Sequence, residues 1–186
     1  MHLEEAIAAI RRGEIVGVPT DTVYGLAVDP LQAGAVRALF DLKGRPRNKP
    51  IGLLGDTLDD FRPLVEVTPV VEELVAGHWP GPLTLVARSL VDLPEWVGDH
   101  QRHTVAIRVP DHAYARRLLS LVGPLAVTSA NPSGLQPAIS RAAAVAYFED
   151  AVAVFLAGPC HGGTSSTVVD VTVEPPKVLR RGPIEL

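Results

Sequence analysis

Short apolar runs separated by proline and glycine are the feature of this sequence that most limits its fold. The chain has 186 residues, with 17 prolines and 16 glycines that lie between the apolar runs and not in one low-complexity tract. Both residues interrupt regular elements and favour turns. The pattern therefore predicts many short elements joined by defined turns. Aromatic residues make up only 5%, so the core must consist mainly of Val, Leu, Ile and Ala.

Several of the apolar runs are typical of strands. Residues 83–87 and 104–109 are rich in apolar and β-branched residues, which indicates buried strands. Further short strands are expected at residues 15–18, 51–54, 125–128, 152–156, 167–173 and 177–180. Residues 20–25 are rich in hydroxyl groups, and we interpret them as a loop at the end of a strand.

Helical periodicity occurs in five other segments. Helices are expected over the first dozen residues, at 35–42, from Pro69 after a capping Thr68, at 111–121, and from a capping Ser140 to 148. Strands and helices mix without strict alternation, and no linker or repeat divides the chain. We therefore expect one α/β domain over residues 1–186, with an open twisted mixed sheet, flanking helices, and polar loops at one end of the strands.

Composition and charge narrow the class of protein. The chain is 47% apolar and 20% charged, which is typical of a globular protein, and its net charge of −4 is unusual for a protein that grips nucleic acid over its whole surface. Its single cysteine, Cys160, excludes an internal disulfide framework, and its histidines lack the spacing of metal ligands. No secretion signal or membrane-spanning run is evident, so we expect a cytoplasmic protein that binds no metal through its side chains.

The common nucleotide and nucleophile motifs are absent from the sequence. Neither G-x-x-x-x-G-K-[ST], G-x-G-x-x-G nor G-x-S-x-G occurs. His161 follows Cys160 directly, but neighbouring loop residues do not usually face each other, so an unreactive thiol is the favoured interpretation.

Four cations lie at alternating positions after the helix expected at residues 35–42. These are Lys43, Arg45, Arg47 and Lys49. In an extended segment, alternate side chains point to one side, an order that prolines 46 and 50 can break. A polyphosphate grip needs several such cations, and a solvated loop is the alternative.

Two more features are consistent with an anion site. Arg108 follows the apolar residues 105–107, and a charge at the end of a buried strand needs either a ligand or an internal ion pair. Arg180 closes the last expected strand, and the turn at residues 128–131 offers hydroxyl, amide and N–H groups to an anion. Together these features indicate nucleotide or phosphate binding.

Seven blocks of the chain, in order, resemble the YrdC-like threonylcarbamoyl-AMP synthases. They are residues 19–26 (PTDTVYGL), 43–46 (KGRP), 79–84 (WPGPLT), 106–110 (AIRVP), 128–134 (TSANPSG), 166–170 (STVVD) and 179–180 (LR). The resemblance implies an open twisted sheet with a large concave basic cavity. It also implies a reaction of L-threonine, bicarbonate or CO₂, and ATP that gives L-threonylcarbamoyl-AMP and pyrophosphate. A threonylcarbamoyl-transferase complex would then modify tRNA.

The resemblance also implies roles for particular residues. The K-x-R and S-x-N elements of active synthases correspond to Lys43, Arg45, Ser129 and Asn131, with Asn131 shaping the site. Threonine would contact Thr22, Arg108 and Ser166. ATP, which brings Mg²⁺ bound mainly to phosphate and water, would contact Lys43, Arg45, Lys49, Thr104, Ser129 and Arg180. Lys49 replaces an expected asparagine, and Leu54 stands where many members have a polar residue.

Two competing interpretations belong to other classes of protein. An RNA-binding module without catalysis would use the same cationic surface, although the negative net charge and scarce aromatic residues do not favour it. A carbamoyl-transfer domain of the hydrogenase-maturation type would carry additional acylphosphatase-like, zinc-finger and transferase regions. We expect neither those regions nor the extra C-terminal domain of larger relatives.

Overall fold

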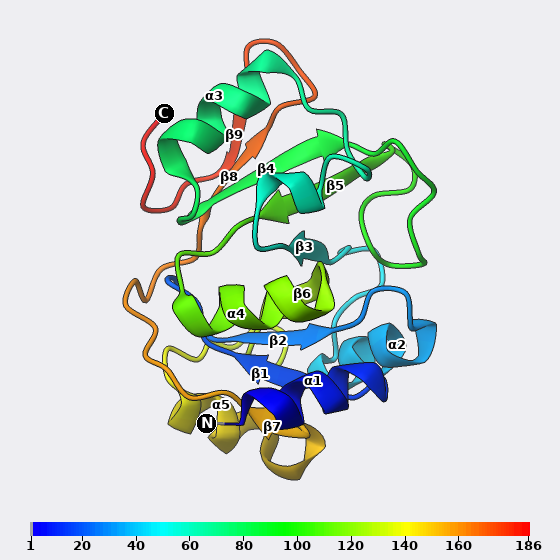
Figure 1. Cartoon of the computed structure of the whole chain (residues 1–186), viewed down its shortest axis with the longest axis vertical. Coiled ribbons are helices and arrows are strands. Elements are labelled where there is room, and N and C mark those ends of the chain that lie inside the picture. Colours follow the sequence, from blue (N-terminus) through cyan, green and yellow to red (C-terminus); the bar gives the residue numbers. More distant parts are fainter. Residues whose placement is uncertain (1) are drawn as a thin grey trace.

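A single mixed sheet organises the computed structural model, which describes residues 2–186. Its nine strands lie in the order β7-β1-β2-β6-β3-β5-β4-β8-β9, from the bottom of Figure 1 to the top. In chain order the strands are β1 Val16–Val18, β2 Gly25–Val28, β3 Gly52–Leu54, β4 Leu83–Arg88, β5 Thr104–Arg108, β6 Leu125–Ser129, β7 Val154–Phe155, β8 Thr167–Asp170 and β9 Lys177–Arg180. Three neighbouring pairs are parallel (β1–β7, β3–β5, β4–β8) and the other five are antiparallel, so the expected mixed sheet is confirmed.

Five α-helices and two short 3₁₀ turns flank the sheet in the described part of the chain. They are α1 Leu3–Arg11, α2 Ala33–Lys43, α3 Pro69–His78, α4 Ala113–Val122, α5 Arg141–Phe148, η1 Leu58–Asp60 and η2 Glu149–Ala151. In Figure 1, α1 and α4 lie in front of β1, β2 and β6, and α3 lies beside β4, β8 and β9. The predicted caps are confirmed, because the side chains of Thr68 and Ser140 accept hydrogen bonds from the N–H groups of Val71 and Ala143.

Hydrophobic clusters pack against both faces of the sheet. One joins α1 and α4 to strand residues such as Val16, Ala27 and Leu125. The larger cluster packs α2, α3 and the segment after η1 against the opposite face, with Leu26, Leu85 and Ile107 fully buried. Alternate residues of β2 therefore enter different clusters, as the period of two of a strand requires.

The sequence prediction failed at β2. Residues 20–24 of the segment expected as a loop (20–25) do form a hydroxyl-rich loop after β1, but Gly25–Val28 forms a strand that pairs with both β1 and β6. This four-residue strand has no polar alternation because it is buried on both sides. The strands expected at 152–156 and 167–173 exist but are shorter than predicted. Met1, part of the first predicted helix, lies outside the described residues.

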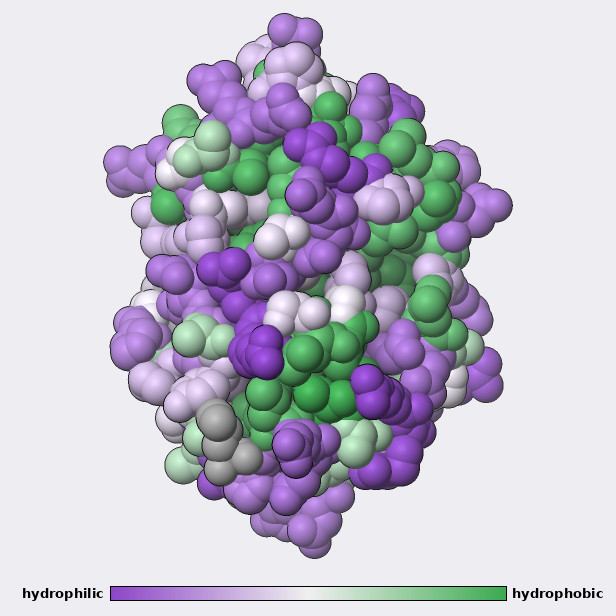
Figure 2. All heavy atoms as spheres, viewed as in Figure 1, coloured by the Kyte–Doolittle hydropathy of each residue, from purple (hydrophilic) through white to green (hydrophobic). Residues whose placement is uncertain are grey.

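Hydrophilic side chains cover most of the face shown in Figure 2, with a hydrophobic area in its lower half, where α1 and α4 lie in Figure 1. Among residues 2–186, no helix combines the length and the apolar character that a membrane crossing requires.

Candidate active site

A pocket of about 280 Å³ opens on one face of the sheet. Its floor is formed by alternate residues of the central strands, including Gly25 in β2, Gly52 in β3 and Ala106 in β5. The three have little or no side chain, and a Cβ on Gly52 would lie 2.7 Å from the carbonyl oxygen of Ala106. The hollow therefore exists because small residues from three strands meet on one face.

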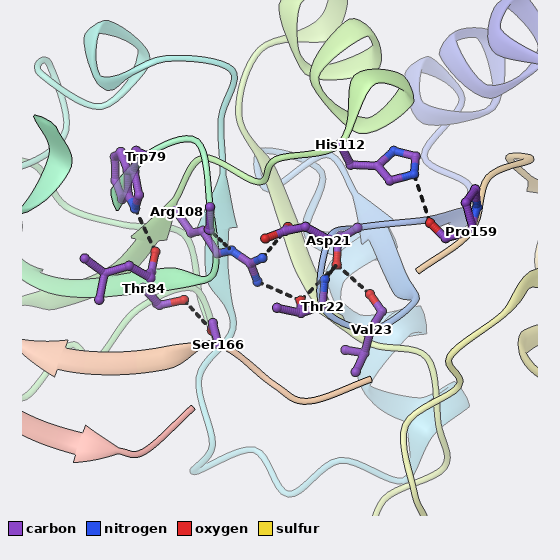
Figure 3. A network of polar contacts seen from close by, with 12 residues as sticks. Asp21, Thr22, Val23, Trp79, Thr84, Arg108, His112, Pro159 and Ser166 are labelled. Atoms are coloured by element: carbon purple, nitrogen blue, oxygen red, sulfur yellow. Dashed lines mark hydrogen bonds and ion pairs between the residues drawn. The ribbon is translucent and has the colours of Figure 1, made fainter. Parts of the chain in front are cut away.

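Arg108 lies at the end of β5 and is 5% exposed. Its Nε donates to the carbonyl of Gly81 and its Nη1 to the Thr22 hydroxyl, both at 2.9 Å, and its Nη2 pairs with Oδ1 of Asp21. Figure 3 shows this network, in which the guanidinium lies between Asp21 and Thr22. Burial lowers the pKa of Arg108, while Asp21 acts in the opposite direction. Of the five N–H bonds of the guanidinium, three are used here, so two remain for a ligand.

A second polar group lies between β4 and β8. The hydroxyls of Thr84 and Ser166 are 2.8 Å apart, and Arg180 Nη2 donates to the Ser166 hydroxyl at 3.1 Å. The Arg180 guanidinium also donates to the Ser166 carbonyl from Nε, at 3.0 Å. Since Ser166 and Arg180 both line the pocket, β9 contributes a cation to a site whose floor lies on the central strands.

Arg45 reaches the pocket from the loop after α2. Gly44 ends the helix with a left-handed φ of 57°, which turns the chain so that Arg45 faces the sheet. Its Nε and Nη2 donate to the carbonyls of Lys49 and Pro50 at 2.8 and 2.9 Å, and Nη1 lies 3.4 Å from the Thr128 hydroxyl. Burial lowers the pKa of Arg45.

Lys43 anchors a turn and does not line the pocket. The residue is 4% exposed, and its ammonium donates at 2.5 Å to the carbonyls of both Ser129 and Asn131. Burial, with a contribution from the positive charge of Arg45, lowers the pKa of Lys43 to about 8. Asn131 in turn donates to the carbonyls of Pro132 and Leu135, so the turn is held from both sides.

The structure brings together six of the ten predicted site residues. Those that line the pocket are Thr22, Arg45, Arg108, Ser129, Ser166 and Arg180. Lys43 and Asn131 lie behind it, as described above. Thr104 is buried at the far end of β5, on the same sheet face as Ala106 and Arg108 but outside the lining. Lys49 is exposed, and its carbonyl holds Arg45.

The expectation that alternate cations share one face is wrong for the basic segment. Lys43 is buried at the end of α2, while Arg47 is exposed and stacks on Trp96, 4.5 Å from the ring centroid. Helix geometry ends at Lys43 and the left-handed Gly44 follows, so the segment is not extended and its residues do not alternate. The large extent expected for the basic cavity stays a prediction.

Sequence reasoning missed several pocket groups. Asp21, the ion-pair partner of Arg108, lies within the PTDTVYGL block but was given no role. Asp21 is not in the pocket lining itself, but Thr20, Thr84, Thr128 and Ser165 are, and each carries a hydroxyl group. Three of the four (Thr20, Thr84 and Thr128) lie within the blocks that resemble the synthase family, and that resemblance was the available signal. Leu54 lines the pocket with an apolar side chain.

The charges of the pocket are unbalanced. Three arginines and no carboxylate line it, and within residues 2–186 neither Arg45 nor Arg180 has a carboxylate partner within ion-pair distance. Burial lowers the pKa of Arg180 as it does that of Arg45. Partly buried cations without counter-charges are costly, and an anionic ligand would relieve that cost. The arrangement is suited to bind phosphate and carboxylate groups together.

Comparison with known proteins shows the family to which this chain belongs. The sequence profile of the Sua5/YciO/YrdC family, described as "Telomere recombination", matches residues 8–182. The chain therefore belongs to this family.

Individual relatives agree with this assignment. A Mycobacterium tuberculosis (strain H37Rv) protein, provisionally named a threonylcarbamoyl-AMP synthase, is 42% identical over 181 residues, which cover 96% of this chain and 83% of that protein. The threonylcarbamoyl-AMP synthase of Pseudomonas syringae pv. syringae (strain B728a) is 38% identical over 170 residues, 90% of this chain and 91% of its own.

A solved structure shows the same fold. The crystal structure of Pyrococcus abyssi Sua5 complexed with L-threonine has a TM-score of 0.91 and 35% sequence identity. The match covers 97% of this chain and 54% of that one, so this chain spans about half the length of the Sua5 protein.

Proposed function

We propose that this protein is a threonylcarbamoyl-AMP synthase, a nucleotidyltransferase that converts L-threonine, bicarbonate or CO₂, and ATP into L-threonylcarbamoyl-AMP and pyrophosphate. The observation that carries the proposal is the convergence of Arg45, Arg108 and Arg180 on one hydroxyl-lined pocket without a lining carboxylate. Such a site matches a substrate pair that brings a triphosphate and a carboxylate. The names of the relatives and the threonine bound to P. abyssi Sua5 support the choice of reaction.

Threonine would bind at the Arg108 end of the pocket. The two unused N–H groups of the guanidinium would hold its carboxylate, with the hydroxyls of Thr22 and Ser166 beside it. Asp21, Thr22 and the Gly81 carbonyl fix the guanidinium before the substrate arrives, which reduces the entropy lost on binding.

ATP would bind where Arg45, Ser129 and Arg180 line the pocket. Lys43 would support this end by holding the 129–131 turn and adding positive charge behind it, with Asn131 completing the turn. The proposal also retains Lys49 and Thr104 as residues that would contact ATP. Among residues 2–186 the lining offers hydroxyls and no carboxylate, so Mg²⁺ would enter on the phosphate oxygens of ATP and on water.

The reaction needs no protein nucleophile. The threonine amine combines with bicarbonate to give a carbamate and water. A carbamate oxygen then forms a bond to the α-phosphorus, the bond from that phosphorus to the β-bridging oxygen breaks, and pyrophosphate carries away the negative charge. The arginines would contribute by orienting the two substrates and stabilising charge on the phosphates. The product would pass to a threonylcarbamoyl-transferase complex that modifies tRNA, in the cytoplasm.

Pyrophosphate release tests the proposal. Purified protein with Mg·ATP and bicarbonate should release pyrophosphate with threonine, much less with serine or valine, and none without an amino acid. We expect Lys43→Ala and Arg45→Ala largely to abolish the release, and Arg108→Ala chiefly to weaken the use of threonine. Near-normal rates in all three variants would contradict the site assignment.

The same assay distinguishes the alternative, an RNA-binding module without catalysis. Such a module would bind tRNA and give no threonine-dependent turnover. The absence of an aromatic side chain from the pocket lining does not favour this reading, because readers of single-stranded RNA stack bases on aromatic rings.

A further inference from the structure

The connection from β7 to β8 crosses the sheet from one edge almost to the other, because β7 is the first strand in the sheet order and β8 the eighth. Residues 158–163 form the middle of this connection, which we call the crossover loop, and contain no helix or strand. The loop leads directly into Ser165 and Ser166, which line the pocket. Its position therefore affects the threonine end of the proposed site.

Two glycines allow the crossover loop to lie close against the rest of the chain. A Cβ on Gly162 would be 2.7 Å from the carbonyl oxygen of Asp21, and the N–H of Gly163 donates to the Thr22 carbonyl at 2.9 Å. A Cβ on Gly158 would be 2.8 Å from the ring of His112. The loop thus contacts the Asp21–Thr22 turn at one end and His112 at the other.

His112 makes a side-chain hydrogen bond to this loop. It is 7% exposed, follows the Arg108 strand at the start of α4, and places Nε2 3.1 Å from the Pro159 carbonyl (Figure 3). A carbonyl only accepts, so Nε2 must carry the proton and donate. Its Nδ1 is buried and has no hydrogen-bond partner among residues 2–186. Within residues 2–186 the ring therefore has one hydrogen bond, and the acceptor of that bond lies in the crossover loop.

We propose that His112 is a positioning residue for the threonine end of the pocket: its Nε2–H holds Pro159 and thereby keeps the crossover loop against the Asp21–Thr22 turn. Arg108 depends on the same turn for two of its three contacts. Release of the loop would therefore disturb the position of the Arg108 guanidinium, which is proposed to bind the carboxylate of threonine. This role rests on the proposed function, although the seating of the loop can be measured without it.

Cys160 lies in the crossover loop, is half-buried, and is the single cysteine of the chain. Its rate of reaction with a thiol reagent such as DTNB therefore reports how well the loop is seated. The His112→Phe variant keeps an aromatic ring but loses the donor. We expect it to raise both the Cys160 reaction rate and the KM for threonine about fivefold, the loss expected for one hydrogen bond, with little change in the KM for ATP.

Three further variants make the test specific. His112→Gln retains an N–H donor and should recover most of both effects. His100→Phe is the matched control, because His100 also places Nε2 3.1 Å from a proline carbonyl, that of Pro94, but is exposed in a different loop; both readouts should stay at wild-type values. Gly162→Ala would push the loop away from the Asp21 carbonyl and should raise the Cys160 reaction rate and the KM for threonine as His112→Phe does. This variant can therefore test the proposal if His112→Phe does not fold.

Unchanged Cys160 reactivity in folded His112→Phe and Gly162→Ala would overturn the proposal. A raised threonine KM with normal Cys160 reactivity would overturn it too, since His112 would then act without moving the loop. If the wild type releases no pyrophosphate with threonine, the proposed function fails, whereas the thiol rates still decide whether His112 seats the loop.

Discussion

Arg108 forms the internal ion pair that the sequence offered as an alternative to a ligand site, and it also lines the pocket. Its pairing with Asp21 compensates the buried charge, and no group within residues 2–186 accepts a hydrogen bond from its two remaining N–H groups. Asp21 therefore stabilises a buried guanidinium beside the pocket and uses only one of its N–H groups.

Replacing Arg108 should affect threonine far more than ATP. For Arg108→Lys we expect kcat/KM for threonine to fall about 10- to 100-fold, since charge-assisted hydrogen bonds contribute about 1.5–3 kcal/mol and lysine cannot reproduce the planar fork. Steady-state kinetics with each substrate varied would measure this. Equal losses for both substrates would contradict a carboxylate site at Arg108.

Lys43 gives a prediction on pH. Its pKa of about 8 means that the free protein loses this positive charge as pH rises through 8. If the charge supports ATP binding, kcat/KM for ATP should fall on the alkaline side with an apparent pKa near that value, and Lys43→Arg should move the fall to higher pH. A pH–rate profile of both proteins would show it.

The stability of the protein should depend on the pKa of Lys43 as well, but it should rise with pH where the activity falls. The folded pKa lies below the ordinary value of 10.5, so between about pH 8 and 10.5 the unfolded chain binds the proton and the folded one does not. The contribution of Lys43 to stability therefore increases with pH across that window. Urea unfolding should show the wild type gaining stability relative to Lys43→Met as pH rises, and a constant difference would contradict a neutral buried amine.

At the scale of elements, the pocket depends on small residues at neighbouring positions of the central strands. The alternation of each strand puts large residues such as Leu53 and Ile107 into the core and leaves Gly52 and Ala106 on the other face. The same register thus produces both the core and the hollow.

Two glycine substitutions, one in the pocket floor and one in α3, should test whether the small residues of the floor are required for ATP binding and stability. Gly52→Ala places a Cβ 2.7 Å from a backbone oxygen in the pocket floor, so we expect a loss of about 1–3 kcal/mol in the free energy of unfolding and weaker ATP binding. Gly77→Ala in α3 meets nothing within 4 Å and should stabilise by about 0.5–1 kcal/mol without affecting binding. Urea melts and ATP titration would measure both, and a stable, active Gly52→Ala variant would contradict the tight floor.

At the scale of the molecule, one site joins segments from residue 20 to residue 180. Its groups come from strands at the centre of the sheet and from β9 at one edge, so the site can form only when the strands from β2 to β9 in the sheet order have paired. Ligand binding should therefore stabilise the whole fold and not one part of it.

Mg·ATP should raise the melting temperature of the protein. At about 100 times its Kd, a ligand adds about 2.7 kcal/mol to the free energy of unfolding, which corresponds to about 5–10 °C for a chain of this size. The double variant Arg45→Gln, Arg180→Gln should show almost no shift. Stabilisation by tRNA but not by Mg·ATP would favour the RNA-binding alternative.

Local patterns in the sequence determined most of the elements and the chemical nature of the site. Periodicity and capping residues located the five helices and eight of the nine described strands, and the cations and hydroxyls indicated an anion ligand. These features depend on neighbours within a few residues, which is the range over which a sequence pattern carries information.

The tertiary structure alone decided which of these groups meet. Strand order is set by long-range pairing, so nothing local placed Arg180 beside Ser166, joined Asp21 to Arg108, or turned Lys43 away from the pocket toward the carbonyls of the 129–131 turn. The side chain of a residue does not reveal whether its partner will be a ligand or a backbone oxygen far along the chain. Only the packed sheet settles this, because burial makes each unpaired charge or carbonyl costly and so selects the pairings that satisfy them.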